Sequence, residues 1–393
     1  MKKLSIAAYQ IEGQPMFKLL GRIQEMEKAG RSIMHFEIGD PDFSTPANIV
    51  SSACRSLQAG ETHYTSSLGM REFREAASDA TESSRGFRPT LDQVLATPGA
   101  NIIIYYAVRC LVDPGEEVIV PDPCFPTYLS VIRFCGAVAV KVPLREENEF
   151  RMSPEDIRKS ITPKTRLIIM NSPQNPTGAV MTAAEIDEVY NIAREKDVYL
   201  LSDEIYARMV YEDSPKFYSP SVHDGCRERV IVTNGFSKAF AMTGWRLGCA
   251  IGPEDVIDKM SLLLQTTSSC VAPFIQRAGI EAIKGPQDDV RAMMAEYRAR
   301  RDILVDGLNR LHGVTCLRPG GAFYVFPNIT GTGMSDEAFS TAMLEEAGVG
   351  LLPGSNFGET GKGHIRMCYA TSRENIVEGL NRMKNYLERK RGS

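Results

Sequence analysis

Between about residues 90 and 285, short apolar runs rich in β-branched residues alternate with longer stretches of amphipathic sequence. The runs read "QVLATPG", "EVIVPDP", "AVAVKVPL", "TRLIIMNSP", "VYLLSDEIY", "VIVTNG" and "LGCAIG". Strands that are apolar on both faces are covered on both sides, which is typical of a largely parallel sheet. One intervening stretch, "AAEIDEVYNIAREKD", carries apolar residues at helical spacing. The pattern predicts an α/β fold whose large domain has a mostly parallel, seven-stranded sheet sandwiched by helices.

After about residue 285 this alternation ends. A charged helical stretch, "DDVRAMMAEYRARRDILVDGLNRL", precedes the strand-like "GGAFYVFPNI", a polar helix and the strand-like "GHIRMCYA". This succession predicts a smaller α+β domain. The first 45 residues have no strand partner of their own, so we expect them to join the smaller domain. The predicted division is a large domain at 46–285 and a small domain formed by 1–45 and 286–393.

Composition narrows the class of protein. The chain has 393 residues, a formal net charge of −4 and 43% hydrophobic residues, which are ordinary values for a globular protein. The negative charge gives no electrostatic reason to expect nucleic acid or an anionic membrane as a partner. The opening "MKKLSIAAYQIEGQ" has too short an apolar stretch for a signal peptide, and the chain has no run of about eighteen apolar residues.

The cysteines and histidines argue against a metal centre. Nine cysteines are dispersed singly without a CxxC pair, and the five histidines show no metal-binding spacing. We therefore expect no metal site. An odd number of dispersed cysteines suits a reducing compartment, so the sequence predicts a cytoplasmic protein.

Polar side chains follow several predicted strands at their carboxyl ends, where α/β sheets place their ligands. Lys238 and Arg246 stand beyond "VIVTNG", although a buried ammonium is costly unless it is paired or deprotonated. Asp203 ends the apolar run in "LLSDEIY", and Tyr206 follows three residues later. Taken alone, Asp203 also suits a helix N-cap, and Lys238 suits a surface lysine.

Three further motifs add different chemical groups at this edge of the sheet. Asn175 lies in "NSPQNPTG", in a turn fixed by prolines and a glycine. The motif "TPGAN" begins a helix at Ala100 and Asn101, whose backbone N–H groups have no partner within that helix. Phe125 lies on the proline-stiffened loop "PDPCFPTY". Turn chemistry alone explains Asn175 and core packing alone explains Phe125, so only the combination indicates a site.

The combination matches the functional groups of one cofactor. An arginine beside a helix N-terminus binds a phosphate, and a lysine that spends time unprotonated forms a Schiff base with an aldehyde. A buried aspartate keeps a heteroaromatic nitrogen protonated, and a flat aromatic side chain stacks on a ring. Phosphate, aldehyde and pyridine nitrogen occur together in pyridoxal 5′-phosphate, which we therefore expect as the cofactor.

These motifs, in this order, resemble those of the class I/II aminotransferases, a family of fold type I pyridoxal-phosphate enzymes. The resemblance extends over about residues 13 to 385 and is carried by "GDPDFSTP", "HYTSSLGMREFREA", "TPGAN", "NSPQNPTG", "SDEIYA", "FSKAFAMTGWRLG" and "GHIRMCYA". It implies an enzyme that moves an amino group between an L-amino acid and a 2-oxo acid.

The resemblance implies a role for each residue that matches a family motif. Lys238 would form the Schiff base with the cofactor and shuttle the proton at the substrate Cα. Asp203 would pair with the pyridinium nitrogen, and Phe125 would stack on the ring. Asn175 and Tyr206 would hydrogen-bond the phenolic oxygen.

The resemblance also implies how the phosphate and the substrate are held. The phosphate ligands within one subunit would be Ala100, Asn101, Ser237 and Arg246. Tyr64 would reach the phosphate of the neighbouring subunit, which requires a homodimer with composite active sites. Arg366 would clamp the substrate α-carboxylate, helped by Asn175 and by the backbone near Ile38 and Gly39.

Some positions depart from the family pattern. Gly235 stands where many relatives carry a phosphate-binding Ser or Thr, for which Ser237 is expected to compensate. Asn101 stands where some aspartate-specific relatives carry a lysine for the side-chain carboxylate. Glu12, in the segment expected to cover the pocket, would suit a cationic substrate, or it is an exposed residue of a mobile arm. We therefore expect a neutral or cationic amino acid, rather than aspartate, as the preferred donor.

Two alternatives remain beside the aminotransferase. A pyridoxal-phosphate lyase, dehydratase or cyclase of the same fold would use the same residues, because it also begins with deprotonation of Cα by Lys238. The other is a non-catalytic cofactor-binding domain of a transcription regulator. The absence of a basic helix-turn-helix extension and the complete catalytic set argue against that second alternative.

Overall fold

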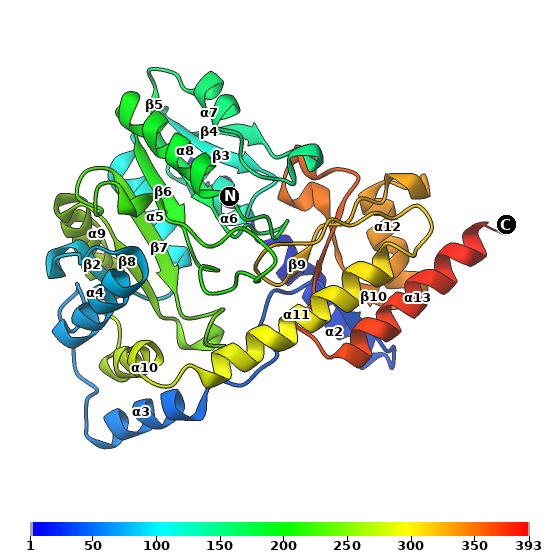
Figure 1. Ribbon diagram of the computed structural model, residues 1–393, viewed down its shortest axis with the longest axis horizontal. Helices are drawn as coiled ribbons and strands as arrows, with labels where there is room; N and C mark the ends of the chain where they lie inside the picture. The colour runs from blue at the N-terminus through cyan, green and yellow to red at the C-terminus, as the bar shows by residue number, and fades with distance from the viewer. Residues whose placement is uncertain (1–2, 392–393) are drawn as a thin grey trace.

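The computed structural model describes residues 3–391, and its largest unit is one seven-stranded sheet (Figure 1). In spatial order its strands are β2 (Val94–Thr97), β8 (Gly248–Ile251), β7 (Val230–Gly235), β6 (Tyr199–Asp203), β5 (Thr165–Asn171), β3 (Glu117–Asp122) and β4 (Val138–Pro143). Within this sheet only β8 runs antiparallel to its neighbours. Each of the seven apolar runs supplies one strand, so the predicted mostly parallel α/β sheet is confirmed.

Thirteen α-helices are distributed along the described chain (Figure 1). Those before or among the strands of the large sheet are α1 (Ile6–Tyr9), α2 (Pro15–Lys28), α3 (Ala47–Gln58), α4 (Arg71–Arg85), α5 (Asn101–Leu111), α6 (Pro126–Phe134), α7 (Pro154–Ser160) and α8 (Ala183–Glu195). Those after β8 are α9 (Glu254–Ser268), α10 (Pro273–Lys284), α11 (Asp288–Leu308), α12 (Asp336–Ala342) and α13 (Arg373–Arg391). The stretches expected to be helical from their spacing form α8 and α11.

The alternation of side chains along the strands explains why both faces of the sheet are covered. On β5, Ile168 and Met170 belong to the core cluster that also contains apolar residues of α8. Their neighbours Leu167 and Ile169 belong to the cluster that contains apolar residues of α5 and α6. All four side chains are at most 1% exposed, so the strand is buried on both sides.

A second core lies around the C-terminal strands. β12 (Ile365–Cys368) pairs antiparallel with β11 (Leu352–Pro353) on one side and with β9 (Tyr324–Val325) on the other. β1 (Met34–His35) pairs in parallel with β10 (Val349–Gly350). Apolar residues of α11, α12 and α13 pack on these strands in one cluster. The N-terminal segment thus adds a strand to the C-terminal part of the chain.

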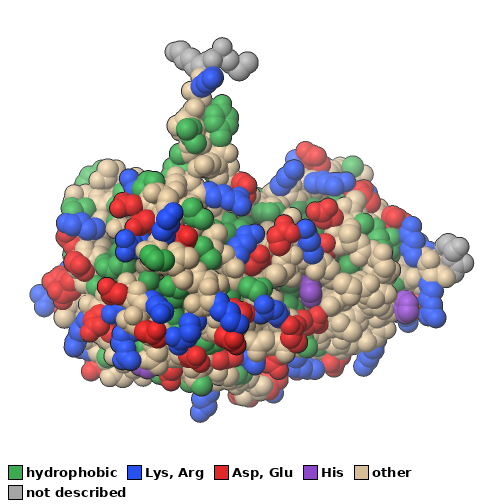
Figure 2. Space-filling model, turned by 90° about the horizontal axis from the view of Figure 1, so that it is seen from above, with side chains coloured by type: hydrophobic (Ala, Val, Ile, Leu, Met, Phe, Trp, Pro, Cys, Tyr) green, Lys and Arg blue, Asp and Glu red, His purple; other side chains and the backbone are tan. Residues whose placement is uncertain are grey.

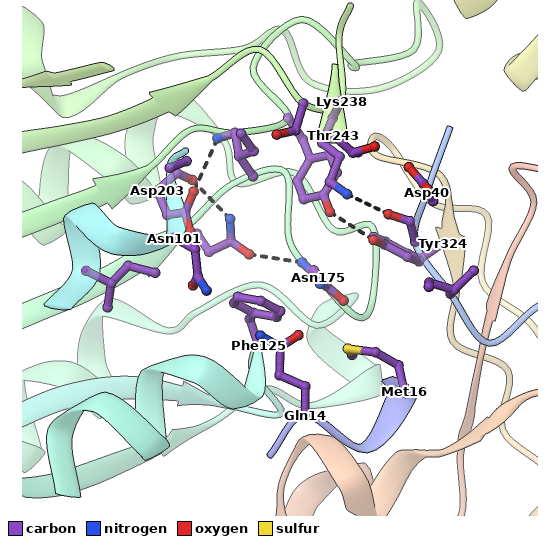
Figure 3. Close-up of a pocket in the computed structure, with 18 of the residues that line it drawn as sticks. Gln14, Met16, Asp40, Asn101, Phe125, Asn175, Asp203, Lys238, Thr243 and Tyr324 are labelled. Carbon is purple, nitrogen blue, oxygen red and sulfur yellow. Dashed lines mark hydrogen bonds between the residues drawn. The ribbon is translucent and has the colours of Figure 1, made fainter. Parts of the chain in front are cut away.

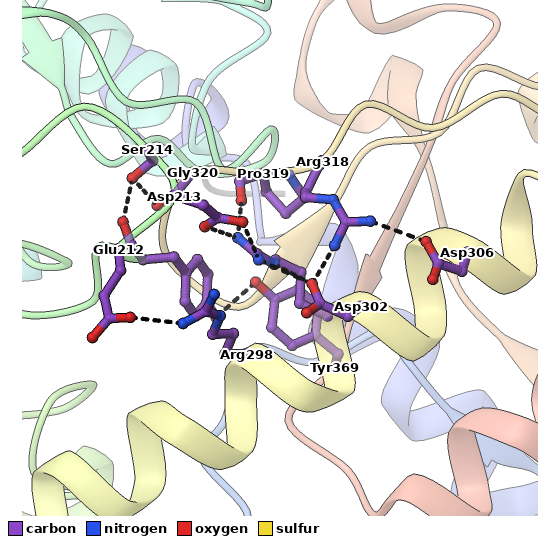
Figure 4. Close-up of polar contacts among 12 residues, drawn as sticks. Glu212, Asp213, Ser214, Arg298, Asp302, Asp306, Arg318, Pro319, Gly320 and Tyr369 are labelled. Carbon is purple, nitrogen blue, oxygen red and sulfur yellow. Dashed lines mark hydrogen bonds and ion pairs between the residues drawn. The ribbon is translucent and has the colours of Figure 1, made fainter.

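Arginine side chains bind the long helix α11 to the segment that follows β6 (Figure 4). Arg301 is 1% exposed, and its guanidinium donates to both carboxylate oxygens of Asp213 at 2.9 and 2.7 Å. Arg318 is paired with Asp302 and Asp306, both on α11. The bidentate geometry fixes the angle between Arg301 and Asp213, so it ties α11 to the segment that follows β6.

Among residues 3–391, no helix combines the length and the apolar character that crossing a bilayer requires. The same part of the chain holds no group of three or more His, Cys, Asp or Glu side chains placed to bind a metal ion. All nine cysteines are free thiols.

Candidate active site

A cavity of about 590 Å³ opens at the carboxyl ends of the central strands (Figure 3). Its wall combines the ends of β5 and β6, the segment after β7, the N-terminus of α5, the N-terminal segment and strands β9 and β12. Eleven of the thirteen site residues predicted from the sequence line it, namely Gly39, Ala100, Asn101, Phe125, Asn175, Asp203, Tyr206, Ser237, Lys238, Arg246 and Arg366. The fold thus gathers side chains that lie far apart in the sequence.

Lys238 points into this cavity from the turn after β7 (Figure 3). Its ammonium donates to the carbonyl oxygen of Gly39 at 2.5 Å. No carboxylate is bonded to it in the described chain, and burial lowers its pKa from 10.5 to about 8, although the nearby charge of Asp40 opposes the shift. This lysine is therefore deprotonated much more readily than one on the surface, and the alternative of a surface lysine does not describe its position.

Asp203 is the last residue of β6, and its carboxylate is 5% exposed. The hydroxyl of Tyr128 donates to Oδ2 at 2.6 Å, and the N–H of Ile205 donates to Oδ1 at 3.2 Å. Burial raises the Asp203 pKa from 3.8 to about 6, against the effect of both hydrogen bonds. No helix begins after Asp203, so it is not a helix N-cap. A cationic ligand would stabilise the ionised form of this carboxylate.

Arg366 is the most constrained cation of the cavity, with 1% of its surface exposed. Its guanidinium lies between the rings of Tyr324 and Phe357, 4.6 and 4.8 Å from their centroids. One terminal nitrogen donates to Asn175 Oδ1 at 3.1 Å, and the other donates to the carbonyl oxygen of Glu37 at 2.6 Å. The buried Nε has no partner in the described chain, and buried donors are rarely left so. Asn175 and Glu37 each accept one N–H of a terminal nitrogen, so the guanidinium keeps a further N–H on each of these two nitrogens for an anion.

Arg246 and the N-terminus of α5 form a second cationic corner. Gly99 has a φ of +86°, and a Cβ there would lie 2.3 Å from Nη2 of Arg246, so glycine is required for this close approach. Arg246 donates to the carbonyl of Thr243 at 2.8 Å. Within residues 3–391, the N–H groups of Ala100 and Asn101 have no recorded acceptor. Free helix N–H groups beside a guanidinium match the requirements of a phosphate.

Comparison with known proteins agrees with this geometry. The family model of the class I and II aminotransferases matches residues 31–383. The chain belongs to this family. It is 41% identical to the aspartate aminotransferase of Pyrococcus horikoshii, over 94% of each chain. It is 40% identical to aromatic-amino-acid aminotransferase 2 of Thermococcus litoralis, over 94% of this chain and 95% of the relative.

A solved structure of the aspartate aminotransferase from Rhizobium meliloti superposes with a TM-score of 0.94 at 32% identity, over 99% of this chain and 100% of that one. The predicted family, fold type and enzyme class are therefore confirmed. The protein is an amino-acid aminotransferase, and its substrates are an amino acid and a 2-oxo acid.

Two predicted site residues of this aminotransferase do not line the cavity. Glu12 is exposed and bound to Arg133 of α6 at 2.7 Å, so the structure gives no geometric support for its contact with the substrate. Instead it helps to strap the N-terminal segment to α6, where Gln14 also donates to Thr127 at 3.0 Å. Tyr64 is 86% exposed and does not line this cavity.

Sequence reasoning missed several residues that line the aminotransferase site, among them Tyr128, Tyr324 and Asp40. Tyr128 donates to Asp203, Tyr324 shares a hydrogen bond with the hydroxyl of Tyr206 at 2.9 Å, and Asp40 lines the cavity beside Lys238. Tyr128 is three residues after Phe125, one helical turn away, and Asp40 follows Gly39 in a quoted motif. These two spacings in the sequence could have identified Tyr128 and Asp40 as site residues. Nothing in the sequence near Tyr324 indicates its contact with Tyr206, because that contact joins two distant segments.

Proposed function

We propose that this aminotransferase uses pyridoxal 5′-phosphate, bound in the cavity that Lys238 enters. The observation that carries the proposal is that Lys238, which has no bonded carboxylate in the described chain, enters the same cavity as Arg246 and the N-terminus of α5. When bound, this cofactor supplies an aldehyde that accepts an amine and a ring that withdraws electrons from the substrate Cα. Lys238 would hold the aldehyde carbon and move the proton at Cα.

The residues present fit each end of the cofactor. The N–H groups of Ala100 and Asn101, with Ser237 and Arg246, would hold the phosphate. Asp203 would pair with the ring nitrogen and hold its proton, since its own buried carboxylate has only neutral donors in the described structure.

The ring itself would rest on the same wall. Phe125, which caps α6 and lines the cavity, would pack on its face. Asn175 and Tyr206 lie within the same wall and would donate to the phenolic oxygen. Arg366 would bind the α-carboxylate through the guanidinium N–H groups that Asn175 and Glu37 leave free, and place the substrate Cα at Lys238, with the backbone of Gly39 beside it.

We propose further that the active form is a homodimer with composite sites. The N-terminal segment projects from the body of the subunit (Figure 2) and exposes Leu4, Ile6, Tyr9 and Ile11 by 57–80%. So many exposed apolar side chains on one segment favour contact with a second copy. Tyr64, which is also exposed, would reach the partner's phosphate. A fully active monomer in solution would contradict this assembly.

The proposal also includes the division into domains and the cellular location. The proposed division into residues 46–285 and 1–45 with 286–393 is supported by two apolar clusters, one mainly around the large sheet and one mainly around the C-terminal strands, although Met16 and Phe326 belong to the first cluster and Tyr211 to the second. The nine free cysteines support a cytoplasmic location.

The names of the relatives differ between aspartate and aromatic amino acids, so they do not decide which amino acid is the donor.

The test is chemical. The purified protein loaded with pyridoxal 5′-phosphate is expected to be yellow, and borohydride should attach the cofactor irreversibly to the peptide that contains Lys238. Addition of an amino acid should shift the cofactor absorbance and release the matching 2-oxo acid. Lys238→Ala should retain cofactor binding and lose turnover by several orders of magnitude, because the nucleophile and the base disappear together. Attachment to another lysine would refute the assignment.

A further inference from the structure

We propose that the hydroxyl of Tyr324 is a positioning group, which donates a hydrogen bond to Tyr206 so that Tyr206 donates its own proton to the phenolic oxygen of the cofactor. The inference rests on the proposed function, which assigns Tyr206 to that oxygen. Tyr324 would act through Tyr206 and would not contact the phenolic oxygen itself.

The two hydroxyls hold one proton more than the hydrogen bond between them uses. Tyr206 and Tyr324 are 3% and 2% exposed, and their hydroxyl oxygens lie 2.9 Å apart. Within residues 3–391 neither hydroxyl has another recorded partner. Each phenol carries one O–H, so one hydroxyl donates to the other and the second proton has no acceptor in the described chain. Buried polar groups are rarely left in this state, and both residues line the cavity, so the second proton is available to a ligand oxygen.

The position of Arg366 favours Tyr324 as the donor within this pair. The guanidinium carbon lies 4.6 Å from the centroid of the Tyr324 ring, and a cation against a phenol ring makes the hydroxyl a stronger donor. Burial raises the pKa of both hydroxyls, and the charge of Arg366 is the strongest effect that opposes the shift at Tyr324, where Asp40 acts less strongly in the opposite sense. At Tyr206 the charge of Asp203 adds to the shift. The proton of Tyr206 is therefore the one left for a ligand.

Close contacts hold the Tyr324 hydroxyl beside that of Tyr206 (Figure 3). A Cβ at Gly39 would lie 1.9 Å from the hydroxyl oxygen of Tyr324, so glycine is required for this approach. The two tyrosine rings meet edge to face with their centroids 5.9 Å apart. On β9, Tyr324 is also fixed by its register with Cys368 of β12. These contacts hold the oxygen in place, while the hydroxyl proton can still rotate towards Tyr206.

A chain of two hydroxyls donates more strongly than one, because each hydrogen bond polarises the next by about 10–30%. The phenolic oxygen of the bound cofactor and the nitrogen that attaches the cofactor to Lys238 share one proton. Stronger donation from Tyr206 to the oxygen therefore makes the nitrogen lose this proton more readily. The pH midpoint of the cofactor absorbance measures this effect without any turnover.

The test is Tyr324→Phe, which removes the hydroxyl and keeps the ring against Arg366. The absorbance of the holoenzyme is titrated with pH in the absence of an amino acid. The midpoint should rise by about 0.2–0.6 pH unit, which corresponds to the loss of about 10–30% of a charge-assisted hydrogen bond. A midpoint equal to that of the wild type would overturn the inference alone. If the wild-type protein binds no cofactor, the proposed function fails and the inference fails with it.

Tyr369→Phe is the matched control. The hydroxyl of Tyr369 is buried and lies 2.9 Å from that of Tyr211, the same separation as in the first pair, and neither residue lines the cavity. Its loss should leave the midpoint at the wild-type value. An equal rise in Tyr369→Phe and Tyr324→Phe would show that the loss of any buried hydroxyl disturbs the site, which would contradict the assigned role.

A double-mutant cycle tests whether Tyr324 acts through Tyr206. Tyr206→Phe should raise the midpoint by about 1–2 pH units, because the whole hydrogen bond to the phenolic oxygen is lost. Adding Tyr324→Phe to this variant should change the midpoint no further, since the residue that carries the effect is absent. Additive shifts would mean that Tyr324 acts on the cofactor without Tyr206, and the inference would be wrong.

Discussion

The hydrogen bond from Tyr128 to Asp203 should make the stability of the cofactor-free protein depend on pH in a way that Tyr128→Phe exposes. Both side chains are buried, and the 2.6 Å bond is one of two that the carboxylate accepts. The Asp203 pKa is raised from 3.8 to about 6, so ionised Asp203 opposes folding. This penalty is absent below about pH 4, develops as the pH rises towards 6 and reaches about 3 kcal/mol above that.

Removing the Tyr128 hydroxyl should increase the free-energy cost of holding ionised Asp203 in the folded protein. This extra cost applies only at pH values at which Asp203 is ionised. A hydrogen bond to a charged group contributes about 1.5–3 kcal/mol, and one between neutral groups about 0.5–1.5 kcal/mol. Tyr128→Phe should therefore lower the free energy of unfolding by about 1 kcal/mol more at pH 8 than at pH 4.5. Urea denaturation of the cofactor-free variant and wild type at both pH values measures this difference.

Tyr106→Phe is the control for this experiment. Tyr106 is equally buried and shares a 2.8 Å hydrogen bond with the hydroxyl of Thr267, which does not titrate in this range. Its loss should cost about 0.5–1.5 kcal/mol, the same at both pH values. If Tyr128→Phe behaves in the same pH-independent way, the buried carboxylate of Asp203 is not ionised in the folded protein and the reasoning fails.

Two further predictions concern substrate binding. Arg366→Lys removes the forked guanidinium that lies against the rings of Tyr324 and Phe357. The value of kcat/KM should therefore fall for every donor alike, by an amount equivalent to about 1.5–3 kcal/mol. A loss confined to one donor would contradict the assignment of Arg366 to the α-carboxylate. Glu12→Gln breaks only an exposed ion pair with Arg133, so kcat/KM should change by less than about 1 kcal/mol and equally for uncharged and cationic donors. A selective loss of the cationic donor would instead place Glu12 at the substrate.

The sequence predicted the parts of the structure that follow from local patterns. The runs that became β2, β3 and β5 to β8 are apolar on both faces, and side-chain alternation explains their burial between helices, whereas the edge strand β4 leaves Val138 and Lys141 exposed. Lys238 and Asp203 were identified because a charged side chain directly after a buried apolar strand is unusual. Such contradictions point to function without any knowledge of long-range contacts.

What the sequence did not reveal depends on distant contacts. Glu12 looked available to a ligand because its partner Arg133 is 121 positions away, and nothing local indicates that they meet. Tyr324 touches Tyr206 across a similar interval. Strand β1 escaped recognition because it has two residues and pairs with β10, which lies more than three hundred positions further along the chain. Local periodicity cannot report a two-residue strand.

Burial moves the two central ionisable groups of the cavity in opposite directions for the same reason. Each loses the hydration of its charged form, so the pKa of Lys238 falls to about 8 while that of Asp203 rises to about 6. A larger fraction of the lysine is therefore unprotonated near neutral pH, and available as a nucleophile and base. The ionised aspartate is stabilised more by pairing with a cation than an exposed carboxylate would be. A cofactor that brings an aldehyde and a basic ring nitrogen would relieve both costs at once.

One short segment, residues 34–39, contacts both Lys238 and Arg366. The carbonyl of Glu37 accepts from Arg366, and two residues later the carbonyl of Gly39 accepts from Lys238. The segment is anchored by the pairing of β1 with β10 and by a 2.8 Å contact between His35 and the Glu37 carboxylate, which raises the His35 pKa to about 9. Because both carbonyls belong to one anchored segment, a shift of β1 would move the acceptors of Arg366 and Lys238 together. The positions of both acceptors therefore depend on the pairing of β1 with β10, outside the cavity itself.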